Sequence, residues 1–314
     1  MNDSPTPAST RLTSLDIFRG ATMAAMIVVN NPGDWEHVYS PLLHAPWHGC
    51  TPTDLIFPFF LFMVGAALPF SLETRIARQP RSELVAKILR RGVILFLIGF
   101  ALGLFPDILF RPLETLRDCR IPGVLQRIAI SYVAAALISI YFKPKTQAVI
   151  AFALIAIYSA GMFFFPVPGH GRGVFDVEGN FCWWVDRQLL FGHTYSGSPA
   201  KGFDPEGVWS TLTAIAGTQF GCFAGRLLRT DRDPYQKLTL LFVAGQLFLI
   251  GAYVSSLGMP INKQLWTTSY LFLVTGLALN GLGLLYYAAD LRGMRLGVSL
   301  WLVFGTSSLL AYVL

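Results

Sequence analysis

The sequence predicts an all-α, polytopic membrane protein built as one transmembrane helical bundle. Of its 314 residues, 54% are hydrophobic and only 13% are charged, whereas soluble domains carry roughly 25% charged residues. Mean hydropathy is +0.53, and apolar runs of the length that crosses a bilayer, about 20 residues, recur along the chain. Backbone groups in lipid must pair within their own segment, which favours helices for these runs.

About nine apolar runs have the length of membrane spans, and together they form a single domain over residues 1–314. We expect the spans at Leu15–Val29, Leu55–Leu72, Ala86–Phe105, Val124–Phe142, Thr146–Phe165, Val208–Leu228, Leu238–Leu257, Leu265–Tyr287 and Gly297–Leu314. The last run ends without a closing loop or charge, so its final carbonyls would lie unpaired in or near lipid. This ending predicts a C-terminal truncation, with at least one span missing.

Lys and Arg are distributed unequally between alternate loops. One set is basic, and the loop between the second and third spans carries Arg75, Arg78, Arg81, Lys87, Arg90 and Arg91. The alternate set, at residues 30–54, 106–123, 166–207 and 258–264, carries few basic residues. Because basic residues collect in cytoplasmic loops, we expect a cytoplasmic N-terminus and an external position for the alternate set. This bias accounts for the net charge of +6, so no nucleic-acid partner is predicted.

The outer loop at residues 166–207 is the longest connection and is rich in glycine and aromatic residues. A structureless loop of this length is uncommon unless it is functional. We expect it to pack over the outer mouth of the bundle, with a short helix near Cys182–Leu190. Cys50, Cys119 and Cys182 fall in outer loops, which leaves both a disulfide and free thiols open. Their spacing is not that of a zinc site, so no metal is predicted.

The loop at residues 30–54 is the first candidate for a reactive centre. It holds three of the five histidines and no Lys or Arg. His44 can act as a base, an acid or a transient nucleophile near neutral pH. Asn30 ends the first span at the same face and could donate a hydrogen bond to an oxyanion, and Asp54 could orient the imidazole. The alternative is an ordinary set of interfacial residues, since Trp is enriched at membrane surfaces.

A second polar group lies in the segment RIPGVLQR. Arg120 comes directly before the fourth span, and Gln126 and Arg127 lie one turn inside it. Two arginines near a helix N-terminus can form an anion site. Contact with an anionic lipid headgroup is the alternative reading of the same residues.

Two further groups precede later spans. Asp204 and Glu206 come before the sixth span, where acidic residues also suit a helix N-terminus without any chemical role. Asn262, Lys263 and Trp266 come before and at the start of the eighth span, and Lys263 is the one base in its loop. An interfacial aromatic anchor is the alternative for this last group.

Taken in order, these segments resemble one family, the transmembrane acetyltransferases typified by lysosomal heparan-alpha-glucosaminide N-acetyltransferase. The matching stretches are RLTSLDIFRG (11–20), Asn30, HAPWHG (44–49), DLIFPFFLFMVG (54–65), RIPGVLQR (120–127), VDRQLLFGHTY (185–195), FDPEG (203–207), INKQLWTTSY (261–270) and, weakly, GTSSLLAYV (305–313). Each stretch alone is a modest signal, but their order and spacing are specific.

The resemblance implies a reaction and a set of site residues. Members of this family take acetyl-CoA from the cytosol and acetylate an amino sugar on the far side of the membrane. The active histidine of the family matches His44, and a nearby asparagine matches Asn30. The cofactor-binding candidates are Arg120, Gln126, Arg127, Asn262, Lys263 and Trp266. The substrate-binding candidates are Trp47, His48, Asp54, Asp204 and Glu206.

The resemblance also implies a location and partners. A large luminal N-terminal domain of the family has no counterpart here, which favours a bacterial inner membrane over a lysosome. The expected partners are an amino-sugar or other glycan acceptor and membrane lipids, and family precedent makes a homodimer reasonable.

The mechanism predicted from these residues is acetyl transfer at His44. The imidazole either accepts the acetyl group or takes a proton from the attacking acceptor, and the sequence leaves both routes open. Because Arg120 and Lys263 fall on the outer side, we expect them to serve the active site or the acceptor rather than the phosphates of CoA. The alternative function is a transporter or flippase of an anionic or sugar-linked lipid, with Asp16, Arg19 and Arg127 as intramembrane polar sites.

Overall fold

The structure is a computed structural model that describes residues 12–34, 36–76, 78–294 and 297–306. All regular elements within these residues are helical. The α-helices are α1 (Thr13–Asn30), α2 (Ile56–Ile76), α3 (Arg81–Leu104), α4 (Pro112–Asp118), α5 (Val124–Tyr141), α6 (Pro144–Phe164), α7 (Phe181–Leu189), α8 (Thr211–Arg229), α9 (Pro234–Ser256), α10 (Thr268–Leu285) and α11 (Val298–Thr306). Short helical turns are η1 (Ser40–Leu42), η2 (Pro52–Leu55), η3 (Asp107–Leu109) and the π-helical η4 (Tyr286–Leu291).

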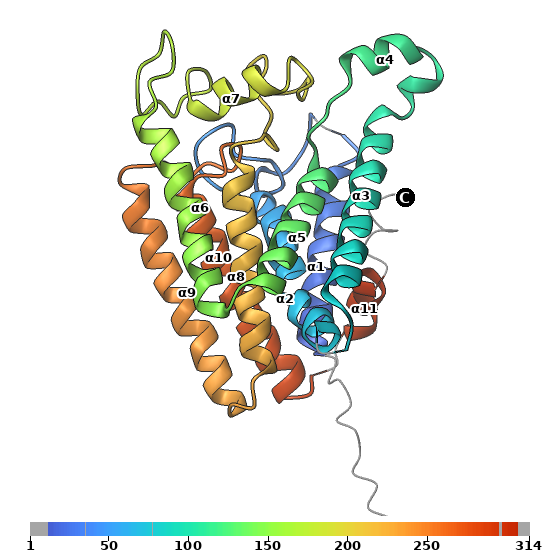
Figure 1. Cartoon of the computed structure of the whole chain (residues 1–314), viewed down its shortest axis with the longest axis vertical. Coiled ribbons are helices and arrows are strands. Elements are labelled where there is room, and N and C mark those ends of the chain that lie inside the picture. The colour runs from blue at the N-terminus through green and yellow to red at the C-terminus, as the bar shows by residue number, and fades with distance from the viewer. Residues whose placement is uncertain (1–11, 35, 77, 295–296, 307–314) are drawn as a thin grey trace, which may run out of the picture.

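The long helices run side by side as one bundle, and the short helices α4 and α7 lie beyond one of its ends (Figure 1). Five segments are long and apolar enough to cross a membrane: 52–73, 124–141, 144–164, 234–256 and 268–291. The predicted all-α membrane bundle is therefore confirmed. The count of nine spans stays a prediction, because α1, α3 and α8 reach 18 to 24 residues but are not among the five. The C-terminal end of the ninth predicted span lies outside the described residues.

Close packing of α2 on α8 holds the centre of the bundle. A Cβ atom on Gly221 of α8 would lie 2.1 Å from the carbonyl oxygen of Phe62, and one on Gly65 of α2 would lie 1.9 Å from that of Thr218. Small residues at such positions let two helix backbones approach closely, which is how helices in membranes gain packing. This contact fixes α2, the helix whose N-terminal end carries the candidate site.

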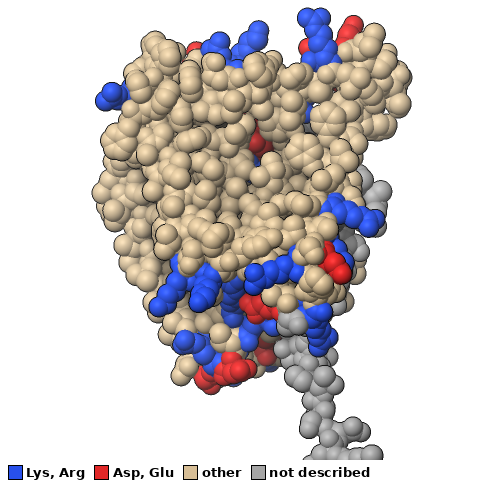
Figure 2. Space-filling model, in the orientation of Figure 1, with Lys and Arg blue, Asp and Glu red and all other residues tan. Residues whose placement is uncertain are grey.

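The four predicted outer loops meet at one end of the bundle, which we call the loop end (Figure 1). Hydrogen bonds join them there, as from Ile121 to His193 and from Trp47 to Phe175. At the opposite end, the basic end, Lys and Arg gather around the ends of the helices. A wide band with few charged atoms separates the two ends on the face in Figure 2. The described basic residues of that end include Arg75, Arg78, Arg81, Lys87, Arg90, Arg91, Lys143, Lys145, Arg226, Arg229, Arg232 and Lys237.

Three local expectations can be compared with the structure. The short helix predicted near residues 182–190 is confirmed as α7, capped by the Asn180 side chain, which accepts from the N–H of Trp183. The four cysteines are free thiols, so the disulfide considered for Cys50, Cys119 and Cys182 is absent from this structure. The eighth span was expected to begin at Leu265, but α10 begins at Thr268, because Thr267 caps it by accepting from the N–H of Tyr270.

Candidate active site

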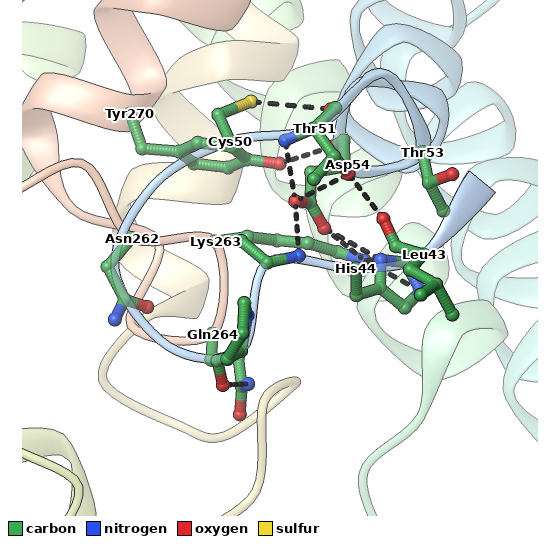
Figure 3. A network of polar contacts seen from close by, with 12 residues as sticks. Leu43, His44, Cys50, Thr51, Thr53, Asp54, Asn262, Lys263, Gln264 and Tyr270 are labelled. Carbon is green, nitrogen blue, oxygen red and sulfur yellow. Dashed lines mark hydrogen bonds and ion pairs between the residues drawn. The ribbon is translucent and has the colours of Figure 1, made fainter. Parts of the chain in front are cut away.

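His44 and Asp54 form the core of the candidate site at the loop end (Figure 3). The Nδ1 atom of His44 lies 2.7 Å from Oδ1 of Asp54. The Asp54 side chain is 1% exposed, whereas that of His44 is 54% exposed. The other carboxylate oxygen of Asp54 accepts from the N–H groups of Ala45 and Thr51 and from the Thr51 hydroxyl, at 3.0 to 3.1 Å. A buried, fully paired carboxylate therefore holds a half-exposed imidazole.

Local sequence explains why Asp54 occupies this position. Thr51 and Asp54 form a reciprocal capping box around η2, in which each side chain accepts from the backbone N–H of the other residue. The Thr51 hydroxyl also lies 2.7 Å from the carbonyl oxygen of Leu43, so its one proton is shared between this carbonyl and Asp54. This contact places the His44 segment over the start of α2. The same side chain thus caps a helix and receives the imidazole.

Lys263 completes a three-residue cluster with His44 and Asp54. Its Nζ atom lies 3.4 Å from Oδ1 of Asp54, and 3.0 and 3.4 Å from Nδ1 and Nε2 of His44. Burial lowers the pKa of Lys263, and the negative charge of Asp54 opposes that effect. His44 Nδ1 cannot both donate to Asp54 and accept from an ammonium group. The shorter contact to a carboxylate favours an Nδ1–H tautomer, which leaves Nε2 with its lone pair.

Tyr270 supports the cluster and was missing from the predicted site. It is fully buried, and its hydroxyl donates to the backbone carbonyl of Asp54 at 2.6 Å. The sequence signal was its position near the start of an apolar span, next to the group at 262–266, where a phenol needs a hydrogen-bond partner. Tyr270 therefore ties α10 to the start of α2.

Asn262 pins the short loop at residues 258–264 to the His44 loop. Its side-chain oxygen accepts from the N–H of Leu265 at 2.8 Å, and its nitrogen lies 3.3 Å from Nδ1 of His48. The N–H of Gly49 also donates to the carbonyl of Ile261 at 2.8 Å. Asn262 is fully buried. Its hydrogen bonds fix the backbone of this loop and therefore the position of Lys263.

Trp266 and Arg127 pack against each other beneath this cluster. Trp266 has a φ of 52°, a left-handed conformation that is uncommon for a residue with a side chain. The Arg127 guanidinium lies 4.9 Å from the Trp266 ring centre and donates to the Gly207 carbonyl at 3.1 Å and to Ser210 Oγ. Trp266 was expected inside the eighth span, at its start. That was wrong, because its backbone turns ahead of α10.

Gln126 is buried beside Arg127 on α5 and fills space that two glycines leave. A Cβ atom on Gly99 or Gly123 would lie 2.5 or 2.7 Å from Gln126 Oε1. The side chain therefore wedges between α3 and the turn that begins α5, where it is 5% exposed.

Arg120, Asp204 and Glu206 form a separate ion cluster. Arg120 donates to both carboxylate oxygens of Asp204, at 2.8 and 2.6 Å, and also to Glu206. Its guanidinium also lies 4.7 Å from the Tyr195 ring centre. Burial disfavours the charged arginine, but the two carboxylates outweigh it and raise the pKa of Arg120. The guanidinium charge is thus already balanced inside the protein.

Asp186 is a buried carboxyl group that the sequence predictions missed. It accepts from the N–H groups of Asp204 and Val208 at 3.1 and 3.0 Å, and burial raises its pKa to about 7. A Cβ atom on Gly207 would lie 2.1 Å from this carboxylate, so only glycine fits there. The signal was an isolated acid in the otherwise apolar start of α7, FCWWVD.

Two predicted residues lie away from the imidazole. Trp47 donates from Nε1 to the Phe175 carbonyl at 2.8 Å, and its ring lies 5.7 Å from that of Phe203, so it joins two outer loops. Asn30 is the last residue of α1 and is exposed. Among the described residues, no hydrogen bond joins Asn30 to His44, and its role as a donor to an oxyanion stays a prediction.

The arrangement defines a class of site, a solvent-facing imidazole backed by a carboxylate and flanked by an ammonium group, at one end of a membrane bundle. Such a set can act as a base or a nucleophile through Nε2. Among the described residues, no group of three or more His, Cys, Asp or Glu side chains could hold a metal ion.

Comparison with known proteins identifies the family. A family model described as heparan-alpha-glucosaminide N-acetyltransferase, catalytic, matches residues 11–170, and the chain belongs to this family. It is 28% identical over 355 residues to the heparan-alpha-glucosaminide N-acetyltransferase of Mus musculus, covering 98% of this chain and 53% of that protein. The Homo sapiens protein of the same name is 28% identical over 352 residues, covering 96% and 52%. The chain thus spans about half the length of the curated relatives it matches, and with its apolar helices it is a multi-pass membrane protein.

Proposed function

We propose that this protein transfers the acetyl group of acetyl-CoA to the amino group of a sugar, or of another glycan acceptor, at the loop end. The observation that carries this proposal is the His44 imidazole, held by buried Asp54 and exposed where an acceptor arrives. Membership of a family described by an N-acetyltransferase name supports the reaction class.

His44 Nε2 is the reacting atom in this proposal. Asp54 fixes the ring through Nδ1, so the lone pair of Nε2 faces away from the carboxylate. In a direct route, Nε2 takes the proton of the acceptor amine as nitrogen attacks the thioester, the C–S bond breaks, and the proton passes to the CoA thiolate. In a covalent route, Nε2 first forms an acetyl-imidazole with release of CoA, and the amine then takes the acetyl group.

Lys263 is the proposed stabiliser of the oxyanion that either route forms. Its ammonium group lies 3.4 Å from Nε2, where negative charge would develop on a carbonyl oxygen next to the attacked carbon. Donors placed at such an oxygen typically contribute a factor of ~10²–10³ in rate. Asn30 stays in the proposal as a second donor, because α1 ends at the loop end, although it makes no contact with His44 here.

Acceptor binding is proposed for the surface between the His44 loop and the loop at 166–207. Trp47 offers an aromatic face and His48 a polar edge. Asp54, Asp204 and Glu206 are the carboxylates proposed to meet the acceptor, each already in an ion pair with Lys263 or Arg120. Of these acids, Glu206 is the more accessible member of the Arg120 pair, at 11% against 0% for Asp204.

The cofactor residues predicted from the sequence fit the acetyl end of CoA better than its phosphates. Asn262 and Lys263 border the imidazole, and Gln126, Arg127 and Trp266 lie in the layer beneath it. Arg120 is already neutralised by two carboxylates. We propose that the basic end faces the cytosol, the source of acetyl-CoA, in a bacterial inner membrane, and that the protein works as a homodimer among membrane lipids.

His44→Ala in purified protein tests the function. With acetyl-CoA and glucosamine, we expect release of CoA thiol and acetylated sugar, measured by mass spectrometry, to fall to background. His37→Ala is the matched control, because His37 is exposed in the same loop and, among the described residues, pairs with Asp34 alone. It should act as the wild type does. Transfer at the wild-type rate by His44→Ala would remove the imidazole from the chemistry.

A further inference from the structure

Residues 204–207 form a tight turn at the loop end, which we call the 204–207 turn. The N–H of Gly207 donates to the Asp204 carbonyl at 2.9 Å, and the order Asp-Pro-x-Gly is typical of a type I β-turn. Both acids of the turn, Asp204 and Glu206, pair with Arg120. The conformation of the turn therefore decides where Glu206 meets the proposed acceptor.

Asp186 on α7 is the side chain that brackets this turn. One of its carboxylate oxygens accepts from the N–H of Asp204, at the start of the turn, at 3.1 Å. The other accepts from the N–H of Val208, directly after the turn, at 3.0 Å. Asp186 is fully buried, and a Cβ atom on Gly207 would lie 2.1 Å from its nearer oxygen. The carboxylate therefore packs directly against the backbone of the turn, with no room for a larger group between them.

The 204–207 turn borders the cluster of His44, Asp54 and Lys263. Burial lowers the pKa of Lys263, and the negative charges of Asp54 and Glu206 oppose that effect. Glu206 therefore acts through space on the ammonium group that lies beside the imidazole. Movement of the turn would change both the charge that an acceptor meets and the charge around Lys263.

The surroundings of Asp186 make its charge sensitive to pH near neutrality. The titratable groups around it are Asp204 in the turn, Arg127 on α5, Cys182 on α7 and Tyr158 on α6. Burial raises the pKa of Asp186 to about 7, although the two backbone N–H donors oppose this effect. An ionised carboxylate accepts stronger hydrogen bonds than a neutral carboxyl group does. The hold of Asp186 on the turn should therefore weaken as the pH falls below about 7 and strengthen as the pH rises above it.

We infer that Asp186 is a positioning residue for acceptor binding, whose ionised carboxylate holds the 204–207 turn, and with it Glu206, beside the His44 cluster. This inference rests on the proposed function for the acceptor, and it adds a fully buried residue that acts through the turn. Protonation of Asp186 then loosens the turn and weakens acceptor binding, while the acetyl donor binds as before.

Asp186→Asn tests this inference, because it keeps the size of the side chain and removes its charge. An amide can accept from only one of the two backbone N–H groups, since its nitrogen is itself a donor. With purified protein, acetyl-CoA and glucosamine at pH 8, we expect KM for glucosamine to rise about three- to tenfold, the effect of about one weakened hydrogen bond. KM for acetyl-CoA should stay unchanged. A loss of kcat with both KM values unchanged would indicate poorer folding alone and overturn the inference.

The KM for glucosamine in Asp186→Asn, divided by that in the wild type, should depend on pH. At pH 6 most of the wild-type carboxyl is neutral, as the amide is, so this ratio should approach one. Other titrating groups, the acceptor amine among them, are common to both assays, so their effects cancel in the ratio. A ratio raised equally at pH 6 and pH 8 would indicate a packing role without a role for the charge, and it would overturn the inference.

Asp176→Asn is the matched control for the change of charge. Asp176 is exposed in the same outer loop, and the same substitution there should leave both KM values as in the wild type. An equal rise of KM for glucosamine in Asp176→Asn would assign the effect to the net charge of the loop end and overturn the inference.

Gly207→Ala moves the turn without changing any charge, because its Cβ atom would lie 2.1 Å from the Asp186 carboxylate. It should raise KM for glucosamine at pH 6 and at pH 8 alike. An unchanged KM for glucosamine in Gly207→Ala would show that the position of the turn does not affect the acceptor, and it would overturn the inference.

Hydrogen exchange, measured by mass spectrometry on peptides covering residues 203–210, tests the same contacts without turnover. At pH 8 the amides of Asp204 and Val208 should exchange faster in Asp186→Asn than in the wild type, and at pH 6 the two proteins should exchange alike. Equal exchange at pH 8 would overturn the inference.

These outcomes separate the inference from the proposed function. Acetyl transfer by the wild type together with an unchanged KM for glucosamine in Asp186→Asn would overturn the inference alone. Faster exchange in Asp186→Asn without any acetyl transfer by the wild type would overturn the proposed function and leave the hold of Asp186 on the turn in place.

Discussion

His44, Asp54 and Lys263 show how three side chains from distant segments share one proton network. Asp54 accepts from two backbone N–H groups and a hydroxyl in addition to facing His44, so its charge is held by the protein and not by water. This leaves the imidazole with a fixed orientation although half of its surface is exposed. The carboxylate therefore fixes the orientation of the imidazole without burying it.

Lys263 gives the reaction a predicted alkaline limit. Because burial lowers the pKa of Lys263, the ammonium group should lose its proton at a lower pH than an exposed lysine would. If the charged form stabilises the oxyanion, kcat/KM should fall as the pH rises through that value. Lys263→Arg keeps the positive charge at alkaline pH, so its profile of kcat/KM against pH should extend further to the alkaline side.

The acceptor amine also gains or loses a proton with pH, and it does so equally in assays of the wild type and of Lys263→Arg. The comparison therefore uses the pH at which kcat/KM falls on the alkaline side, and not the absolute rate. Superimposable alkaline limbs for wild type and Lys263→Arg would contradict a role for the Lys263 charge.

At the residue scale, the sequence predicted site residues best where side-chain chemistry and the family resemblance pointed to the same residues. His44 and Asp54 were singled out together, and the structure brings them into contact. Lys263 was assigned to the cofactor, yet it contacts the imidazole, because loop residues 219 positions apart cannot be paired from spacing alone. Asp186 and Tyr270 were missed because a buried polar group shows its partners only once the fold is known.

At the scale of elements, the α2–α8 contact predicts a sharp dependence on side-chain size. Gly221→Ala would place a Cβ atom 2.1 Å from the Phe62 carbonyl oxygen, so the two helices must separate. Overpacking of this kind costs about 1–3 kcal/mol. We expect a lower midpoint of thermal unfolding in detergent, with weakened activity because Asp54 lies in η2, directly before α2.

Gly103→Ala on α3 is the matched control for this substitution. A Cβ atom there meets no other group within 4 Å, and alanine is the better helix former by about 1 kcal/mol. Its midpoint should equal or exceed that of the wild type. Equal midpoints for both variants would show that the close approach of α2 and α8 does not carry stability.

Helix positions were predictable because length and hydropathy decide them in a membrane. Every predicted span from the first to the eighth contains a long helix within a few residues of its expected bounds. The irregular starts were not predictable. Trp266 was expected at the start of the eighth span, but its backbone turns at φ 52° before Thr267 caps α10. Hydrogen bonds from Leu265 and Thr267 to Asn262 hold this turn, and hydropathy does not predict them.

At the scale of the whole molecule, the unequal charge of the two ends predicts sidedness. Tyr39, 80% exposed at the loop end, and Lys145, exposed at the basic end, are sites for single cysteines. In intact cells a membrane-impermeant maleimide should label Tyr39→Cys, and it should label Lys145→Cys only after lysis. The reverse pattern would overturn the proposed orientation.

Three of the four native cysteines should react little with the maleimide in this experiment. Burial raises the pKa of the Cys50 thiol to about 12 and raises that of Cys182 as well, and thiols that stay protonated react slowly with maleimides. Cys222 is buried within α8. Only Cys119 needs replacement by alanine.

The exposure of His44 to solvent has a consequence for the order in which the two proposed substrates bind. An imidazole with 54% of its side chain exposed is reached by water as readily as by a sugar, and water is far more concentrated. If His44 carries the proposed transfer, an activated acetyl group held there before an acceptor is bound would be open to hydrolysis. The proposed function therefore requires that the acceptor shields the imidazole from water before the thioester reaches it.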